Sequence, residues 1–138
     1  MELTAVCLEL FGVDRLPPAK DKLLPLNEKA EAKRVTQVNS NFGQVSPGLV
    51  QNTTDLLFRE LSLRPALVPR NRSLVTVSSL IAAGQVAPIA YHLNRAMDNG
   101  LTRTQASEVL TRLASYAGWP NAFSALSVVK EVFEKRRK

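Results

Sequence analysis

Apolar positions recur every three or four residues along most of this chain, which is the spacing of an α-helix. The clearest stretches are residues 47–61, 103–117 and 120–133, and each is bounded by proline or glycine. Such spacing puts the apolar side chains on one face of a helix that packs on a core. The pattern therefore predicts an all-α fold, a compact helical bundle with short loops.

Two helix starts are marked in the first half of the chain. Asn27 is a suitable N-cap for a helix over residues 28–38, which carries acidic residues in its first turn. Ser46 and Pro47 form the second start, because serine caps a helix and proline fits its first turn. The expected apolar side of the helix over 47–61 consists of Leu49, Val50, Leu56, Leu57 and Leu61.

The first 26 residues carry weaker signals. Residues 3–13 fit a short amphipathic helix, and three prolines then break residues 14–26 into an extended arm. This arm is too polar and interrupted to pack well on its own domain, so we expect it to wrap a neighbouring subunit. The expected organisation is an N-terminal arm with short helices, residues 1–45, which packs between subunits, followed by a helical domain, residues 46–138.

Glycine and proline divide the second half of the chain. Residues 71–83 are rich in apolar side chains and contain one charged residue, which predicts a helix buried on nearly all sides, with a central strand over 74–77 as the alternative. Gly84 ends this helix, and the next one, over 88–98, begins at a proline and ends before Gly100.

The last two helices are the most clearly marked. Thr102 and Gln105 form a capping box for the helix over 103–117, and Gly118 ends it before Pro120 opens the final helix. The expected core faces are Val109, Leu110, Leu113 and Ala117 on the first of these helices and Phe123, Leu126, Val129, Val132 and Phe133 on the second.

Composition narrows the classes of function. The 138 residues suffice for one domain, and 6% aromatic residues leave leucine, valine and alanine to build the core. The net charge is +6, but the tail over 135–138 supplies 4 of the 18 basic residues. No aromatic residues interleave with basic ones as in a nucleic-acid surface, and no stretch forms a membrane span or a secretory signal. We expect a soluble, cytoplasmic protein that gains stability by self-association.

Cysteine and histidine each occur once in the chain. Cys7 is the only cysteine, which excludes an internal disulfide, a Cys-x-x-Cys redox pair and a cysteine-based zinc site within one chain. His92 is the only histidine, and it lies downstream of Arg70 and Arg72. Since imidazole titrates near neutral pH and guanidinium groups bind anions, these residues indicate an acid–base site with anion clamps.

Short motifs spread over residues 46–133 carry a family resemblance. They are Leu57-Phe58, Arg64-Pro65, Arg70-Asn71-Arg72-Ser73-Leu74-Val75-Thr76, Ala83-Gly84, His92-Leu93, Asn99-Gly100-Leu101-Thr102 and Tyr116-Ala117-Gly118-Trp119-Pro120-Asn121-Ala122. In this order they resemble the carboxymuconolactone decarboxylase family, which includes the alkyl hydroperoxidase D-like proteins. The resemblance implies an all-α fold of the alkyl hydroperoxidase D-like type that assembles into a trimer or a hexamer.

One branch of this family reduces peroxides with a Cys-x-x-Cys pair. The corresponding positions here are Gln85 and Pro88, so no thiolate is available there to attack a peroxide. The chain resembles instead the cysteine-free branch, which is similar to gamma-carboxymuconolactone decarboxylase. This implies decarboxylation, or a related lyase or isomerase reaction, of a small anionic lactone or carboxylic acid in aromatic catabolism, with no metal and no cofactor.

The resemblance also assigns roles to residues of this chain. His92 is the expected general acid, and Arg72 and Arg64 are the expected groups that bind substrate carboxylates. Glu60 is expected to orient His92 or an arginine. The alternatives are a packed histidine without a chemical role and a structural salt bridge that joins an arginine to Glu60 or to another subunit.

Other side chains complete the expected site. Tyr91 and Tyr116 are expected to line the substrate pocket, with core packing as the alternative. Arg70 and Arg95 are expected to be solvated, and Trp119 to anchor packing or an interface.

Departures from the family pattern leave other substrates and a non-catalytic function open. They lie near Ser62 and Ala66, where an aromatic residue and a glycine are usual, and at Ser115, where a phenylalanine is usual. These changes reshape the expected pocket, so the substrate can be a different acid or lactone. A non-catalytic oligomeric binding or scaffold protein is the second hypothesis, and a peroxidase is opposed by the missing cysteine pair.

Overall fold

The structure is a computed structural model that describes residues 22–136, and every regular element within this range is helical. The all-α prediction is therefore confirmed for the described residues. The chain divides into two compact units, residues 1–66 and residues 67–138, which we describe separately. The expected helix over 3–13, Cys7 and the first part of the arm lie outside the described residues.

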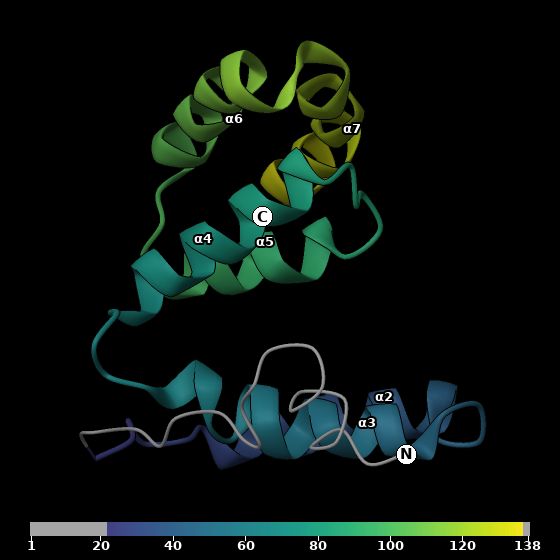
Figure 1. Cartoon of the computed structure of the whole chain (residues 1–138). Helices are drawn as coiled ribbons and strands as arrows, with labels where there is room; N and C mark the ends of the chain where they lie inside the picture. The colour runs from purple at the N-terminus through teal and green to yellow at the C-terminus, as the bar shows by residue number, and fades with distance from the viewer. Residues whose placement is uncertain (1–21, 137–138) are drawn as a thin grey trace, which may run out of the picture. The chain divides into compact units, whose positions relative to one another are not determined.

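Between residues 22 and 66, the first unit holds two helices and two short helical segments (Figure 1). Asn27 caps the first helix, because its side-chain oxygen accepts a hydrogen bond from the Ala30 amide at 3.1 Å, as the sequence predicts. The described end of the arm bonds to its own chain, since the Leu24 amide donates to the Leu63 carbonyl at 2.7 Å. The elements are α2 (Glu28–Phe42), α3 (Pro47–Asn52), η1 (Thr53–Phe58) and η2 (Leu61–Leu63).

The single helix expected over residues 47–61 is wrong. After α3 the backbone widens into the π-helical segment η1, in which the Arg59 amide bonds to the Thr54 carbonyl five residues earlier. Each such turn adds a residue and rotates the following side chains around the axis. The apolar face therefore changes, so that Val50 and Phe58 are buried while Leu49 and Leu57 are exposed.

The second unit consists of four helices around one core (Figure 1). The helix α4 packs against α5, α6 and α7, and α7 also packs against α5 and α6. The buried centre is built from aliphatic residues, the largest fully buried ones being Ile81, Ile89 and Leu93. The helices are α4 (Pro69–Ala82), α5 (Ile89–Asp98), α6 (Arg103–Ala117) and α7 (Trp119–Lys135).

The helix ends of this unit follow the predicted caps. Gly84 and Gly100 adopt positive φ values of 68° and 98° just after α4 and α5. In both places the amide after the glycine bonds back to a carbonyl in the last helical turn, as Gln85 does to Leu80 at 2.8 Å. The capping box between Thr102 and Gln105 has both of its hydrogen bonds, each 3.1 Å long.

Two expectations about burial are wrong in part, although Val129 and Val132 of the expected α7 core face are buried. Residues 71–83 do form a helix rather than a strand, but only Val77 and Ile81 of α4 are buried and Val75 is exposed. In α7 the core positions are Ala122, Ala125, Val129 and Val132, whereas Phe123 and Leu126 are exposed. A four-helix unit covers only part of each helix, so an apolar sequence does not ensure burial. No helix among the described residues is long and apolar enough to cross a membrane.

Candidate functional site

His92 lies one turn into α5 and faces a mixed aromatic and cationic environment. Its amide donates to the Pro88 carbonyl at 3.2 Å, which places the side chain on the regular part of the helix. Its ring meets the ring of Tyr91 edge-on, with 5.0 Å between the centroids. The side chain is partly buried, so the imidazole is neither enclosed in the apolar core nor freely solvated.

Arg72 comes to the same helix pair from the first turn of α4. This turn begins at Pro69, and one guanidinium nitrogen of Arg72 donates to the Leu67 carbonyl just before the helix. The neighbouring hydroxyl, of Ser73, accepts a hydrogen bond from the Asn99 side-chain amide at 2.8 Å. Since Asn99 ends α5, this bond ties the start of α4 to the end of α5.

Arg95 acts electrostatically on both His92 and Arg72. Burial, and then the positive charge of Arg95, lower the pKa of the His92 imidazole below its usual 6.5. The same causes in the same order lower the pKa of Arg72, which stays protonated near neutral pH. Arg95 therefore lies close enough to both side chains for its charge to be felt by each.

Arg70 and Arg95, which are expected to be solvated, are both partly buried and form side-chain hydrogen bonds. One guanidinium nitrogen of Arg70 donates to the Asn71 side chain at 2.8 Å, and one of Arg95 donates to the Tyr91 hydroxyl at 3.3 Å. Sequence reasoning missed Arg95, although its position three residues after His92 puts the two on the same side of α5.

The remaining candidates belong to other elements. Glu60 and Arg64 belong to the first unit, where they form an ion pair with each other, as in the structural alternative considered for Arg64. Tyr116, in the last turn of α6, is 84% exposed. Of the predicted set, Tyr91 contacts His92, and the charge of Arg95 lowers the pKa of both His92 and Arg72.

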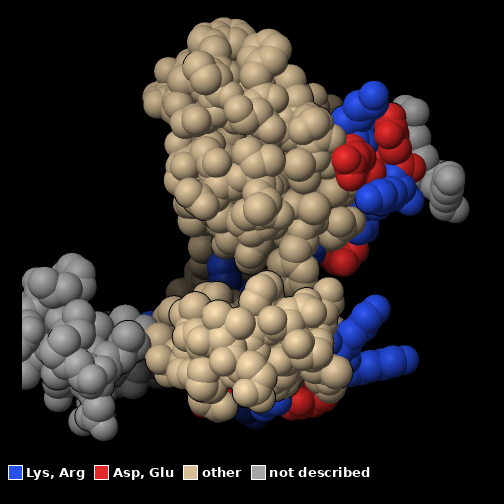
Figure 2. Space-filling view, turned by 90° about the vertical axis from the view of Figure 1, so that its right-hand side faces the viewer, with Lys and Arg blue, Asp and Glu red and all other residues tan. Residues whose placement is uncertain are grey.

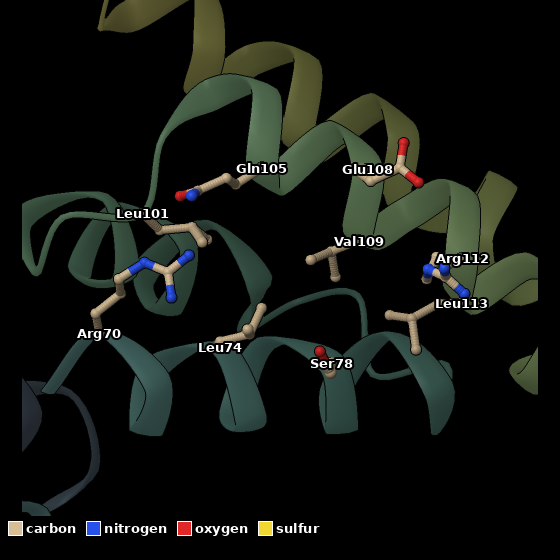
Figure 3. A pocket seen from close by; sticks show the side chains of 9 residues that line it. All are labelled: Arg70, Leu74, Ser78, Leu101, Gln105, Glu108, Val109, Arg112 and Leu113. Atoms are coloured by element: carbon tan, nitrogen blue, oxygen red, sulfur yellow. The ribbon is translucent and has the colours of Figure 1, made fainter. Parts of the chain in front are cut away.

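Two open clefts lie in the second unit. The larger, of about 350 Å³, lies between α4 and α6 and has an apolar floor with Arg70 and Arg112 toward opposite ends (Figure 3). The smaller, of about 280 Å³, lies between α6 and α7. Neither is lined by His92 or Arg72. These clefts are therefore distinct from the Arg72–His92–Arg95 cluster.

The cluster combines groups that suit an anionic ligand. Two guanidinium groups can each grip a carboxylate or an oxyanion, and the imidazole can exchange a proton. Among residues 22–136, no three His, Cys, Asp or Glu side chains gather where they could hold a metal ion. Pro88, at one of the positions that hold cysteines in the peroxide-reducing branch, is the N-cap of α5.

Comparison with known proteins agrees with this description. The model of the carboxymuconolactone decarboxylase family matches residues 47–131. Over 102 residues, 74% of this chain and 76% of the relative, the chain is 35% identical to a 4-carboxymuconolactone decarboxylase from Acinetobacter baylyi (strain ATCC 33305 / BD413 / ADP1). The relative is thus an enzyme, a decarboxylase by its name. By both the family match and the coverage of this relative, the chain belongs to the carboxymuconolactone decarboxylase family.

Proposed function

We propose that the protein decarboxylates a small carboxylated lactone, such as 4-carboxymuconolactone (the gamma-carboxy lactone), with His92 as the general acid. The observation that carries this proposal is the cluster of Arg72, His92 and Arg95 in a chain 35% identical to a decarboxylase of that lactone. Glu60, Arg64 and Tyr116 remain proposed contributors, and the cluster carries the argument without them.

The reaction divides into bond cleavage and proton transfer. The bond between the ring and the leaving carboxylate breaks, its electron pair enters the unsaturated lactone, and carbon dioxide departs. The lactone carbonyl accepts this charge, which gives a dienolate. His92 then protonates the ring carbon next to that carbonyl. This sequence needs no external oxidant or reductant.

Arg72 is the proposed group that binds the carboxylate retained in the product. Binding the leaving carboxylate as tightly would stabilise the ground state and slow the cleavage. A guanidinium on a regular helix, tied to α5 through Ser73 and Asn99, provides a fixed anchor. An anion bound there also offsets the repulsion between Arg72 and Arg95.

The lowered pKa of His92 fits a proton donor that becomes protonated when the substrate binds. Without ligand, burial and Arg95 favour the neutral imidazole. A bound carboxylate adds negative charge beside the ring, which raises the pKa and favours the imidazolium. The substrate thus promotes protonation of the group that later donates to it.

The test is turnover of 4-carboxymuconolactone, followed by ultraviolet absorbance and corrected for the spontaneous reaction. We expect His92→Ala to lower kcat by about 10²–10⁴-fold, which is the usual contribution of a positioned general acid. Arg112→Gln removes an exposed arginine from the same unit and serves as the control, with unchanged kinetics. Equal rates for the native protein and His92→Ala would refute the role of His92.

A non-catalytic binding protein is the second candidate. The observation in its favour is that neither described cleft is lined by His92. It predicts saturable binding of the lactone by calorimetry without release of carbon dioxide.

A further inference from the structure

The contacts of Arg95 support a role that the sequence does not assign to it. Arg95 follows Tyr91 by four residues and His92 by three, so its side chain emerges between theirs on the surface of α5. The Tyr91 hydroxyl accepts its hydrogen bond at 3.3 Å, and the Tyr91 ring meets the His92 ring at 5.0 Å. Tyr91 therefore contacts both the arginine and the histidine.

The charged groups around α5 lie on two sides of the helix, one toward α4 and the other toward α7. Toward α4, Arg95 acts on His92 and on Arg72. Toward α7, Asp98 accepts a hydrogen bond from Arg136 at 2.6 Å, which holds the acidic residue of α5 against that helix. The part of α5 near His92 thus combines Arg95 with the charge of Arg72 from α4.

The proposed reaction needs two groups that act on neighbouring atoms. As carbon dioxide leaves, negative charge develops on the lactone carbonyl oxygen, and the carbon next to that carbonyl is the one that takes the proton. A cation for this oxygen must therefore lie beside the proton donor. Arg95, less than one turn of α5 from His92, meets this condition, whereas Arg72 reaches the site from another helix.

We propose that Arg95 is a further catalytic residue, which binds the lactone carbonyl oxygen as it becomes an oxyanion, and that Tyr91 is a positioning residue that holds Arg95 beside His92. The inference rests on the proposed decarboxylation. It assigns to Arg95 the stabilisation of the negative charge that develops on the lactone carbonyl oxygen. It differs from the role of Arg72, because Arg95 acts more strongly on the transition state than on the bound substrate.

The kinetic test compares Arg95→Gln, Arg95→Lys and Tyr91→Phe with Arg112→Gln as the control. We expect Arg95→Gln to lower kcat by about 10²–10³-fold with KM changed less than about threefold, as for loss of an oxyanion donor. Arg95→Lys keeps the charge and retains an intermediate rate, and Tyr91→Phe falls between Arg95→Lys and the native protein. A rise in KM at constant kcat would overturn the assignment.

A second measurement does not depend on turnover. Tetronate, the anion of a small five-membered enol lactone, resembles the dienolate, and calorimetry reports its affinity. We expect Arg95→Gln to bind tetronate at least about tenfold more weakly than the native protein or Arg112→Gln, because a charge-assisted hydrogen bond is lost. Equal affinities, or no binding to the native protein, would overturn the inference even if the lactone is turned over.

The single histidine gives a third readout. Its imidazole signal in a proton NMR titration belongs to His92 without further assignment. Removing the nearby positive charge in Arg95→Gln should raise the pKa of His92, while Arg112→Gln leaves it unchanged. An unchanged pKa in a folded Arg95→Gln variant would refute the proximity, and Arg95→Lys serves if that variant does not fold. If the native protein does not turn over the lactone, the proposed function fails, while tetronate binding and the titration still decide about Arg95.

Discussion

At the scale of single residues, His92 shows how local environment sets chemical state. An imidazole in water is partly protonated near neutral pH, but here burial and Arg95 both favour the neutral form. The same ring is held against Tyr91, so a change of protonation occurs at a fixed position. The protonation state of His92 therefore depends on the charges placed beside its ring.

The first prediction is that stability falls on acidification through His92. The pKa of His92 is lower in the folded protein than the usual 6.5 of an unfolded chain, so the unfolded state binds a proton first. This group's contribution is thus complete above about pH 6.5 and decreases as the pH falls toward the folded pKa. We would measure urea unfolding between pH 7.5 and 5 for the native protein and His92→Gln. If the free energy of unfolding of the native protein decreases with falling pH no more steeply than that of the variant, the prediction is contradicted.

The residue scale also sets the limit of sequence reasoning about the site. His92 and Arg72 were predicted because rare or charged residues stand in recognisable motifs. Arg95 is expected to be solvated because its sequence position alone does not reveal its hydrogen bond to Tyr91. The contact that ties Asn99 to Ser73, across 26 residues, likewise depends on how α4 meets α5. Helical spacing alone would have placed Arg95 beside His92, and that signal was available.

At the scale of elements, local chemistry predicted helix ends better than helix faces. Asn27, Gly84, Gly100 and the Thr102 capping box depend on hydrogen bonds within a few residues, so their positions could be read directly. Helix faces depend on distant partners. The apolar helix α4 is covered on only part of its surface, and the π-helical turn in η1 rotates a face that regular periodicity would have continued.

The buried ion pair of the first unit joins two of its elements. Glu31 and Arg34 of α2 form two hydrogen bonds of 2.8 and 2.7 Å, and Arg34 also donates to Thr54 at 2.9 Å. The guanidinium carbon of Arg34 lies 4.0 Å from the centroid of the Phe58 ring. With Glu31 only 4% exposed, this network attaches α2 to η1 away from water.

The second prediction follows from this network. Glu31→Ala should lower the free energy of unfolding by about 3–5 kcal/mol, because it removes the carboxylate that accepts two hydrogen bonds from buried Arg34. The matched control is Glu28→Ala, which removes an exposed carboxylate paired with Arg59 at 3.5 Å and should cost less than about 1 kcal/mol. Urea denaturation of both variants tests this, and equal losses would contradict the assignment of Glu31 to a buried network.

At the scale of the whole molecule, the surface of the second unit favours contact with another protein surface. Residues 113–129 contain no charged side chain. Within this run, Trp119 and Phe123 are each 63% exposed, and the centroids of their rings lie 6.3 Å apart. One face of the unit is uncharged over most of its extent, while charges of both signs gather at one edge (Figure 2). Exposed aromatic groups without nearby charge are typical of interfaces.

We propose that Trp119 and Phe123 are buried between copies of this chain, as expected for a trimer or a hexamer. The double variant Trp119→Ser/Phe123→Ser should shift the mass measured by light scattering toward the 15.2 kDa of one chain. Val75→Ser is the control, because Val75 is 56% exposed on α4 and lies outside this uncharged run, so the mass should not change. If the double variant keeps the native mass, these aromatic residues do not hold the assembly. A native protein that already measures as one chain would remove the need for an interface, and the exposed aromatic pair would then require a different partner.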